Sequence, residues 1–384
     1  MERLVTSDLK LGIIAGGQLG KMLIQEASKW DIATYVLDPE ENCPAGSIAT
    51  KHIRGNYLCY EDVISFGRMV DIVTFELENI HIGALKQLKQ EGKKVLPDPE
   101  MLEIIQDKGN QKMMYQSGNI PTSPFKLYTG KEEILRDIRS GTLSFPFVQK
   151  MRVGGYDGRG VSVINSENDL NKIFDVPAVV EQKIDIDKEI AVIAARNEKG
   201  EIKCFPTVEM VFDSQANLVE KLICPSTLSE EKSTLAQNIA KEIINLFDVK
   251  GLLAVEFFLD KTGKLWVNEV APRPHNSGHH TIESIITSQF EQHLRAILNL
   301  PLGSTRLKMP AVMLNLLGEP GYDGPVKYIG LTESLAIEGV KIHLYGKKIT
   351  RGFRKMGHVT IIAPTLEEAI EKSEIIKKLI HVRT

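Results

Sequence analysis

The stretch LLAVEFFLDKTGKLWVNEV, residues 252–270, contains the most informative pattern in the chain. Two apolar runs flank the polar segment 260–263, which is typical of an antiparallel hairpin with a tight turn. With those four residues as the turn, Glu256 faces Val267, and Glu269 lies on the same side, diagonal to Glu256. Diagonal Cβ atoms are roughly 7–8 Å apart, so the two carboxylates can share one metal ion.

The neighbours of both glutamates are apolar, so their charges need compensation. Two like charges in apolar surroundings are costly unless a cation is present. The alternative is that both face solvent on a half-exposed sheet, but Ala254 and Phe258 share the predicted face of Glu256. Mg2+ prefers a few carboxylates together with substrate phosphate oxygens. We therefore predict that Glu256 and Glu269 bind Mg2+.

A glycine-rich loop, GGYDGRG at 154–160, follows a predicted strand that ends at Lys150. The backbone amides of such a loop can donate to phosphate oxygens, and Lys150 and Arg159 supply positive charge. It is not a Walker A loop, because no G-K-[ST] opens a following helix. The alternative is an ordinary hairpin loop, but the glycines beside two cations favour contact with a polyphosphate.

An earlier loop, AGGQLGK at 15–21, lies between a predicted strand and a predicted helix. Free amides at a helix N-terminus attract anions, and Asp38 ends the second strand, which would suit a dinucleotide. However, Ala15 occupies the first glycine position of the G-x-G-x-x-G motif. Another phosphate-bearing ligand, or plain packing of strand on helix, is favoured over a dinucleotide.

A third segment, PRPHNSGHH at 272–280, is rich in hydrogen-bond donors. Its three histidines could suggest a metal site, but they lie in a loop among prolines. A polar pocket for an anion or an amine substrate is the favoured interpretation.

Bulk composition excludes several classes of function. The 384 residues are enough for two or three domains. A net charge of −3 offers no positive field for nucleic acid or an anionic membrane. The four cysteines are scattered, which argues against a disulfide framework or a zinc site. The first apolar run, 11–15, is too short for a signal peptide, and no run approaches the roughly 20 residues of a membrane span. We therefore expect a cytoplasmic protein without a membrane partner.

The first third of the chain alternates short apolar runs with helical patterns. This alternation predicts a doubly wound, mainly parallel sheet. The predicted strands are 11–15, 34–37, 71–75 and 94–96, with helices at 18–30 and 82–91. From about residue 189 strands dominate, and one continuous helix is predicted over 282–298.

Several motifs are more specific than glycine spacing: GGQLGKM at 16–22, TFELENI at 74–80, GGYDGRG at 154–160, NEVAPRPHNSGHH at 268–280 and RKMGH at 354–358. With them the chain resembles, nearly from end to end, the N5-carboxyaminoimidazole ribonucleotide synthetase family of the ATP-grasp superfamily. The resemblance implies an ATP-dependent ligase that carboxylates aminoimidazole ribonucleotide with bicarbonate. It also suggests a homodimer.

The resemblance implies a mixed α/β and α+β fold. We expect an N-terminal doubly wound parallel sheet (the pre-ATP-grasp domain) over 1–105. A two-lobed ATP-grasp fold follows, with a small lobe carrying the flap at 106–185 and a large lobe carrying the metal site at 186–310. A β-rich C-terminal segment at 311–384 is expected to pack on the large lobe.

For ATP, the resemblance implies that Lys150 and the flap bind the phosphates and that Glu189 accepts a ribose hydroxyl. Glu181, Gln182 and Ile184 would line the adenine pocket. The residues expected to bind ATP are Lys108, Lys150, Gly155, Tyr156, Asp157, Gly158, Arg159, Gly160, Val161, Glu181, Gln182, Lys183, Ile184, Glu189, Phe212, Asn268 and Glu269. Lys108 stands where the family usually has Arg, and Phe212 where a His is expected.

For the ribonucleotide, the resemblance implies a site between the first loop, Glu78 and the 273–279 loop, with the basic tail on the 5′-phosphate. The expected residues are Gln18, Leu19, Glu78, Arg273, Asn276, Ser277, His279, Lys347, Arg354 and Lys355. The tail is one residue longer than in some relatives, so Lys348 or Arg351 could replace Lys347 or Arg354.

The residues expected at the reacting groups are Lys150, Tyr156, Asp157, Arg273 and His275. Bicarbonate would attack the γ-phosphorus of ATP to give carboxyphosphate, and closure of the flap would exclude water. The amine would then attack carboxyphosphate, or CO2 released from it. His275 or Asp157 could be the base, and the sequence does not choose between them.

Two other enzymes and a non-catalytic protein compete with this interpretation. A formate-using ribonucleotide transformylase would share the ATP residues, but HNSGHH and the basic tail argue against it. An NAD(P)-dependent oxidoreductase would use the first loop, yet would leave the Glu256/Glu269 hairpin without a purpose. A binding protein of the same fold is disfavoured because the phosphate and metal residues are intact.

Overall fold

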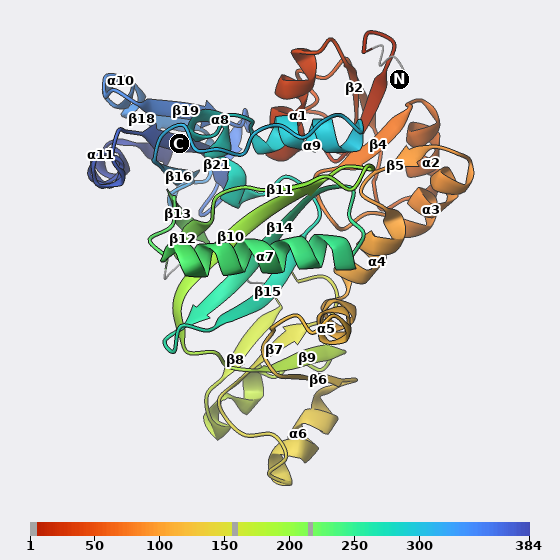
Figure 1. Ribbon diagram of the computed structural model, residues 1–384, viewed down its shortest axis with the longest axis vertical. Coiled ribbons are helices and arrows are strands. Elements are labelled where there is room, and N and C mark those ends of the chain that lie inside the picture. Colours follow the sequence, from red (N-terminus) through yellow and green to blue (C-terminus); the bar gives the residue numbers. More distant parts are fainter. Residues whose placement is uncertain (1–5, 156–159, 214–217) are drawn as a thin grey trace.

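The computed structural model describes residues 6–155, 160–213 and 218–384. Figure 1 shows an N-terminal sheet at the upper right, a small sheet at the bottom, and a long central sheet that reaches the C-terminal elements at the upper left. The mixed α/β and α+β architecture predicted from the sequence is confirmed. Among the helices of these residues, none is both long enough and apolar enough to cross a membrane.

The N-terminal sheet has five parallel strands in the order β3-β2-β1-β4-β5. Helix α1 packs on one face, and α2 and α3 pack on the other, so the sheet is doubly wound as predicted. The strands are β1 (Lys10–Ile14), β2 (Ala33–Asp38), β3 (Lys51–Arg54), β4 (Ile72–Phe75) and β5 (Lys94–Val95). The helices are α1 (Gln18–Ser28), α2 (Tyr60–Arg68) and α3 (Ile82–Gln90).

Two helices, α4 (Pro99–Gln106) and α5 (Lys108–Ser117), lead to the small lobe. This lobe is a four-stranded sheet in the order β6-β9-β7-β8, in which each neighbouring pair of strands is antiparallel. Its elements are β6 (Phe125–Tyr128), α6 (Lys131–Arg139), β7 (Phe147–Met151), β8 (Val161–Ile164), the 3-10 helix η1 (Glu167–Lys172) and β9 (Ala178–Gln182).

The central sheet has nine strands in the order β15-β14-β10-β12-β13-β16-β21-β19, with β11 paired to β10. Helix α7 (Glu230–Leu246) packs on it (Figure 1). The strands are β10 (Ile186–Arg196), β11 (Ile202–Cys204), β12 (Val208–Phe212), β13 (Val219–Cys224), β14 (Gly251–Asp260), β15 (Leu265–Ala271), β16 (Ala311–Leu317), β19 (Val340–Leu344) and β21 (Lys355–Ile362). The sheet thus runs across residue 310, where a boundary is expected, and the domain boundaries stay predictions.

The remaining C-terminal elements cover the end of this sheet. Helix α11 packs against β16 and β21 through apolar side chains. These elements are β17 (Gly324–Pro325), β18 (Lys327–Ile329), α10 (Leu331–Leu335), β20 (Ile349–Thr350), α11 (Leu366–Leu379) and β22 (His381–Arg383).

The single helix predicted over 282–298 is wrong. The chain instead forms the 3-10 helix η2 (Asn276–Gly278), the short helix α8 (Thr281–Ser284) and α9 (Gln289–Ile297). The break occurs because the Ser288 hydroxyl caps a new helix by accepting from the Glu291 amide at 3.1 Å. Phe290, Leu294 and Ile297 of α9 then pack into the same core as α1, which joins the large lobe to the N-terminal sheet.

Candidate active site

The hairpin of β14 and β15 places Glu256 directly opposite Glu269 rather than diagonal to it. The turn predicted over 260–263 is present, because the Gly263 amide donates to the Asp260 carbonyl at 2.8 Å. The predicted facing pair is wrong: the Asp260 amide donates to the Lys264 carbonyl at 3.0 Å, so the loop between these two residues has three residues. The third of these, Gly263, has φ +82°, a conformation that favours glycine. The ladder also shifts between Glu256 and Phe257, which leaves one extra residue in β15. The prediction that both carboxylates share a face is confirmed.

The two carboxylates have different electrostatic surroundings. Burial and the charge of Glu269 raise the pKa of Glu256. In contrast, the ammonium of Lys108 contacts Glu269 and lowers the pKa of that carboxyl. The chain's own cations therefore balance only part of the negative charge of this pair. Such a pair fits a divalent cation.

Within the described ranges, no three His, Cys, Asp or Glu side chains gather as a metal site. An ion bound by Glu256 and Glu269 would need its other ligands from phosphate oxygens and water. Mg2+ commonly binds in this way beside a nucleotide. The two carboxylates of the hairpin therefore fit Mg2+ that is bound together with a phosphate-bearing substrate.

A buried group of charges lies in the small lobe, next to this hairpin. Lys150 of β7 is 9% exposed, and its ammonium lies 3.1 Å from Oε2 of Glu181 on β9. The same ammonium donates to Oδ1 of Asn268 on β15 at 2.8 Å. Lys150 of the small lobe and the β14–β15 hairpin are thus in direct contact, as the predicted ATP site requires.

Glu181 also contacts a second lysine, which the sequence did not single out. The ammonium of Lys112 on α5 lies 3.0 Å from Oε1 of Glu181, and the Ser123 hydroxyl donates to Oε2 at 2.8 Å. Burial alone would raise the pKa of Glu181, but Lys150 and Lys112 together lower it to about 2. The side chain of Glu181 is therefore ionised and paired with both lysines. Any reading of adenine at this position would use the backbone of β9 and the residues that follow.

Those following residues lie at the surface edge of β9. Gln182 and Lys183 are exposed and Ile184 is half-buried. Burial raises the pKa of Glu189, on the neighbouring strand β10, to about 7. Phe212 ends β12 and packs against an apolar cluster with Met210.

Only part of the flap can be placed. Tyr156, Asp157, Gly158 and Arg159 lie outside the described residues. Gly160 has φ +75°, and its carbonyl accepts from the Met151 amide at 2.8 Å. Gly155 and Val161 flank the same loop at the end of β7 and the start of β8.

The segment after β15 brings several predicted substrate residues together. Arg273 pairs with Glu78 through two atoms, with Nε 2.8 Å from Oε1 and Nη2 3.1 Å from Oε2. His275 places its Nε2 3.4 Å from Oε1 of Glu256. This loop therefore links the N-terminal domain, through Glu78, to the β14–β15 hairpin.

The hydrogen bonds of His275 assign its tautomer. The Ser277 amide donates to Nδ1 at 3.3 Å, so the proton of the neutral ring is on Nε2, facing Glu256. Burial lowers the pKa of His275 to about 3. Gln289 fixes the loop by accepting from the His275 amide and donating to its carbonyl, both at 2.8 Å. This arrangement makes Nε2 a hydrogen-bond donor and argues against His275 as the base.

Three amides of the first glycine-rich loop are occupied by the chain's own carboxylates. The Gly16 amide donates to Asp38 at 2.7 Å, and the Gly17 and Gly20 amides donate to Glu76, each at 2.5 Å. A Cβ at Gly17 would lie 2.1 Å from Oε1 of Glu76, so any other residue there would displace this carboxylate. Three amides of this loop thus already have carboxylate partners, which weakens the dinucleotide alternative.

The predicted substrate residues of this loop divide into two kinds. Gln18 is half-exposed at the start of α1, whereas the Leu19 side chain is buried in the apolar core. Leu19 could therefore meet a substrate only through its backbone. Glu76, which positions the loop, was missed, although it stands two residues before the predicted Glu78 on the same motif.

The basic tail lies next to this first loop. The ammonium of Lys21 on α1 lies 3.2 Å from the carbonyls of Leu344 and Tyr345. Burial and then the charge of Arg354 lower the pKa of Lys347 to about 8. Its ammonium donates to the Lys355 carbonyl at 2.8 Å. The tail therefore supplies cations beside the first loop, as expected for a phosphate subsite.

Stacked histidines connect the tail to the 272–280 segment. The rings of His279 and His358 have centroids 4.8 Å apart, and those of His358 and His343 are 4.4 Å apart. Burial lowers the pKa of both His279 and His358 well below the ordinary value. His279 is thus a buried neutral ring that packs the loop in place. Asn276 and Ser277 form η2 beside it, with Ser277 buried.

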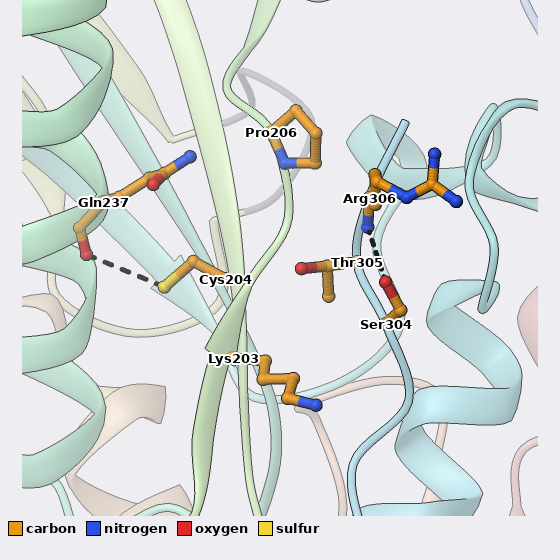
Figure 2. Close-up of a pocket in the computed structure, with 7 residues that line it drawn as sticks. All are labelled: Lys203, Cys204, Pro206, Gln237, Ser304, Thr305 and Arg306. Atoms are coloured by element: carbon orange, nitrogen blue, oxygen red, sulfur yellow. Dashed lines mark hydrogen bonds between the residues drawn. The ribbon is translucent and has the colours of Figure 1, made fainter. Parts of the chain in front are cut away.

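A separate hollow of about 450 Å3 lies between α7 and the segment 304–306 (Figure 2). None of the predicted site residues lines it. Its lining residues are Lys203, Cys204, Pro206, Gln237, Ser304, Thr305 and Arg306. The chemistry described above is therefore built at the junction of the lobes and not in this hollow.

Three family models match successive parts of the chain. The ribonucleotide synthetase preATP-grasp domain matches residues 9–106, the ATP-grasp domain residues 113–290, and the phosphoribosylaminoimidazole carboxylase C-terminal domain residues 311–372. The chain is also 36% identical to N5-carboxyaminoimidazole ribonucleotide synthase of Bacillus subtilis, over 94% of this chain and 93% of that one. A chloroplastic phosphoribosylaminoimidazole carboxylase of Vigna aconitifolia is 38% identical, and the chain spans 65% of its length.

Solved structures with the same fold include complexes. N5-carboxyaminoimidazole ribonucleotide synthetase from Thermotoga maritima is 45% identical, with a TM-score of 0.90 and coverage of 98% of this chain and 99% of that one. The synthase from Aspergillus clavatus, solved with ADP and 5-aminoimidazole ribonucleotide, is 31% identical with a TM-score of 0.88. The match covers 97% of this chain and 99% of the Aspergillus chain.

Proposed function

This chain belongs to the N5-carboxyaminoimidazole ribonucleotide synthase family of ATP-grasp ligases, and on that premise we propose that it carboxylates 5-aminoimidazole ribonucleotide. The reaction uses ATP and bicarbonate. It gives N5-carboxyaminoimidazole ribonucleotide, ADP and phosphate, and it is a step of purine biosynthesis.

One observation carries the proposal: cations of the small lobe meet the anionic hairpin of the large lobe. Lys150 donates to Asn268 at 2.8 Å, and Lys108 pairs with Glu269. A polyphosphate with its metal ion needs both signs of charge side by side. At this junction the ammonium groups come from β7 and α5, and the carboxylates come from β14 and β15.

In the proposed mechanism, Lys150, Lys108 and the flap amides bind the phosphates of ATP and stabilise charge as it develops. Glu256 and Glu269 would hold Mg2+, which neutralises the transferred phosphoryl group when bound. A bicarbonate oxygen attacks the γ-phosphorus, ADP leaves, and carboxyphosphate results. Closure of the flap over 154–160 would keep water from this labile compound.

The acceptor is proposed to lie along Glu78, Arg273 and the 275–279 loop. The Arg273–Glu78 pair fixes the guanidinium, while Lys347, Arg354 and Lys355 would bind the 5′-phosphate. The amine attacks carboxyphosphate, its nitrogen forms the new bond to carbon, and phosphate leaves. Asp157 is proposed as the base because the His275 ring nitrogen that faces the site carries a proton.

For the nucleoside part of ATP, we propose that Glu189 accepts a ribose hydroxyl and that 182–184 contact adenine. A hydroxyl donor would favour the ionised form of Glu189, whose pKa burial raises to about 7. A homodimer and a cytoplasmic location are proposed from the family resemblance and the composition alone.

The test is phosphate release from ATP and Mg2+ at controlled bicarbonate, with and without the ribonucleotide. We expect release to require the ribonucleotide and to yield ADP and an acid-labile carboxylated nucleotide. Release that ignores the ribonucleotide would retain the ATP-grasp chemistry and refute the acceptor. No release under any of these conditions would refute the ligase assignment.

A further inference from the structure

Lys112 occupies a site that is unusual for a lysine, because its side chain is only 3% exposed. It extends from α5, one helical turn after Lys108. Its ammonium donates to Oγ1 of Thr122 at 2.5 Å and to Oγ of Ser123 at 3.1 Å, and it forms an ion pair with Oε1 of Glu181 at 3.0 Å. A buried lysine with two hydrogen bonds and an ion pair is a built feature of the fold, and no step of the proposed mechanism assigns it a role.

The partner of Lys112 is also the partner of Lys150. Glu181 divides its carboxylate, with Oε1 on Lys112 and Oε2 on Lys150 and Ser123. The three ionic groups carry two positive charges and one negative charge. One net positive charge therefore remains in the group, on the side where Lys150 contacts Asn268.

Removing Lys112 would change this charge balance. Glu181 would be left with Lys150 as its only ionic partner, and the two charges would cancel. In a buried site such pairing is strong, because the medium screens it less than water does. Lys150 would then offer much less attraction to a phosphate.

Lys112 also touches the segment that joins the two lobes. Thr122 accepts from Lys112 and donates to the Val267 carbonyl on β15 at 2.8 Å, and the Val267 amide donates to the Pro121 carbonyl at 2.7 Å. Loss of Lys112 could thus act through backbone position alone. A decisive experiment must separate this packing effect from the charge effect.

We propose that Lys112 is a positioning residue that shares the Glu181 carboxylate with Lys150. Because of this sharing, Glu181 compensates only part of the positive charge of Lys150, and the rest can attract the phosphates of ATP. The inference rests on the proposed function in one respect, namely that Lys150 binds those phosphates. It extends that function by assigning a role to a residue that does not itself contact the nucleotide.

Three variants test the proposal: Lys112→Met, Glu181→Gln and the double variant, each titrated with ADP and Mg2+ by calorimetry. We expect K112M to bind ADP at least about tenfold more weakly than the wild type. The double variant should recover most of that loss, because Lys150 then keeps its charge with no carboxylate beside it. E181Q alone should bind no more weakly than the wild type.

A purely structural role predicts a different pattern. The double variant would then bind as weakly as K112M or more weakly, since the two disruptions would add. That result, or a tenfold loss in E181Q alone, would overturn the proposal. The E181Q measurement decides the question even if K112M does not fold.

The matched control is Lys86→Met, which removes a lysine of α3 that pairs with Glu103 of α4. It should leave ADP affinity unchanged. Wild-type protein that fails to bind ADP would count against the proposed function itself. Wild-type binding with an unchanged K112M would count against the role of Lys112 alone.

Discussion

Two charged regions meet at the junction of the lobes, and they are built in opposite ways. In the small lobe, Glu181 lies between Lys112 and Lys150, so one carboxylate serves two ammonium groups. In the large lobe, Glu256 and Glu269 lie opposite each other, with Lys108 on only one of them. The first region therefore carries an excess of positive charge, and the second carries an excess of negative charge.

The difference shows how a site for a metal nucleotide can be stable before its ligand arrives. Each excess is small, because the chain's own opposite charges compensate most of it. The excess positive charge can bind phosphate oxygens, and the excess negative charge can bind a divalent cation. The direct contact of Lys150 with Asn268, next to Glu269, brings the two excesses to the same place.

The largest expected effect comes from Glu256→Gln, which removes the less compensated of the two hairpin charges. We expect ligase activity to fall by about a hundredfold or more, in the range found for losing one electrostatic group at a reacting centre. Stability should stay level or rise, because burial and Glu269 disfavour the charged form of Glu256. Activity assays together with urea unfolding check both statements, with Glu242→Gln on the exposed side of α7 as the control. A clear loss of stability in E256Q would contradict the account.

Arg273→Lys should have the next largest effect. Lysine keeps the charge but cannot reproduce the two contacts that the guanidinium makes with Glu78 at 2.8 and 3.1 Å. We expect kcat/KM for the ribonucleotide to fall roughly tenfold or more, while KM for ATP changes little. Steady-state kinetics with each substrate varied in turn separates the two. Equal losses for both substrates would refute the assignment of Arg273 to the acceptor.

The small-lobe region predicts an acid-sensitive stability. Lys150 and Lys112 lower the pKa of Glu181 from 4.5 to about 2 in the folded protein. A carboxyl with a lowered folded pKa stabilises the protein above the unfolded pKa and loses that effect as the pH falls toward the folded one. We expect Glu181 to contribute about 2 kcal/mol to the loss of unfolding free energy between about pH 5 and pH 3. Urea unfolding at these pH values should show a smaller drop in E181Q, and an equal drop would contradict the ion pairing.

The smallest effect is expected from a surface pair with the same direction of pKa shift. Arg68 lowers the pKa of Glu91 to about 2 through contacts at 2.9 and 2.7 Å, but Glu91 is open to solvent. Water screens such a pair, so Glu91→Gln should leave the thermal midpoint unchanged within error. A midpoint shift as large as that of E181Q would mean that burial does not set the difference between these glutamates.

Much of the fold and of the site could be predicted from local patterns. The strands near 11–15, 34–37 and 71–75 are confirmed because short apolar runs between polar segments leave little choice. The common face of Glu256 and Glu269 could be predicted because alternation within a strand fixes which side chains point to the same side. These are properties of neighbouring residues, which a sequence displays directly.

What could not be predicted depends on contacts between distant segments. The direct pairing of Glu256 with Glu269 needs both a three-residue loop and a one-residue shift in the ladder. Lys112 stands out only once Glu181, 69 positions later in the sequence, lies against it. The occupied amides of the first loop likewise depend on Glu76, which comes from the end of another strand.

The most direct test of the two-region account is the affinity for ADP with and without Mg2+, measured for wild type, E256Q and Lys150→Met. The account predicts that E256Q keeps its metal-free affinity but loses the tightening that Mg2+ gives the wild type. K150M should show the reverse, with weaker metal-free binding and the Mg2+ effect retained. Retention of the full Mg2+ effect in E256Q, or equal losses of both kinds in the two variants, would contradict the division of charge between the lobes.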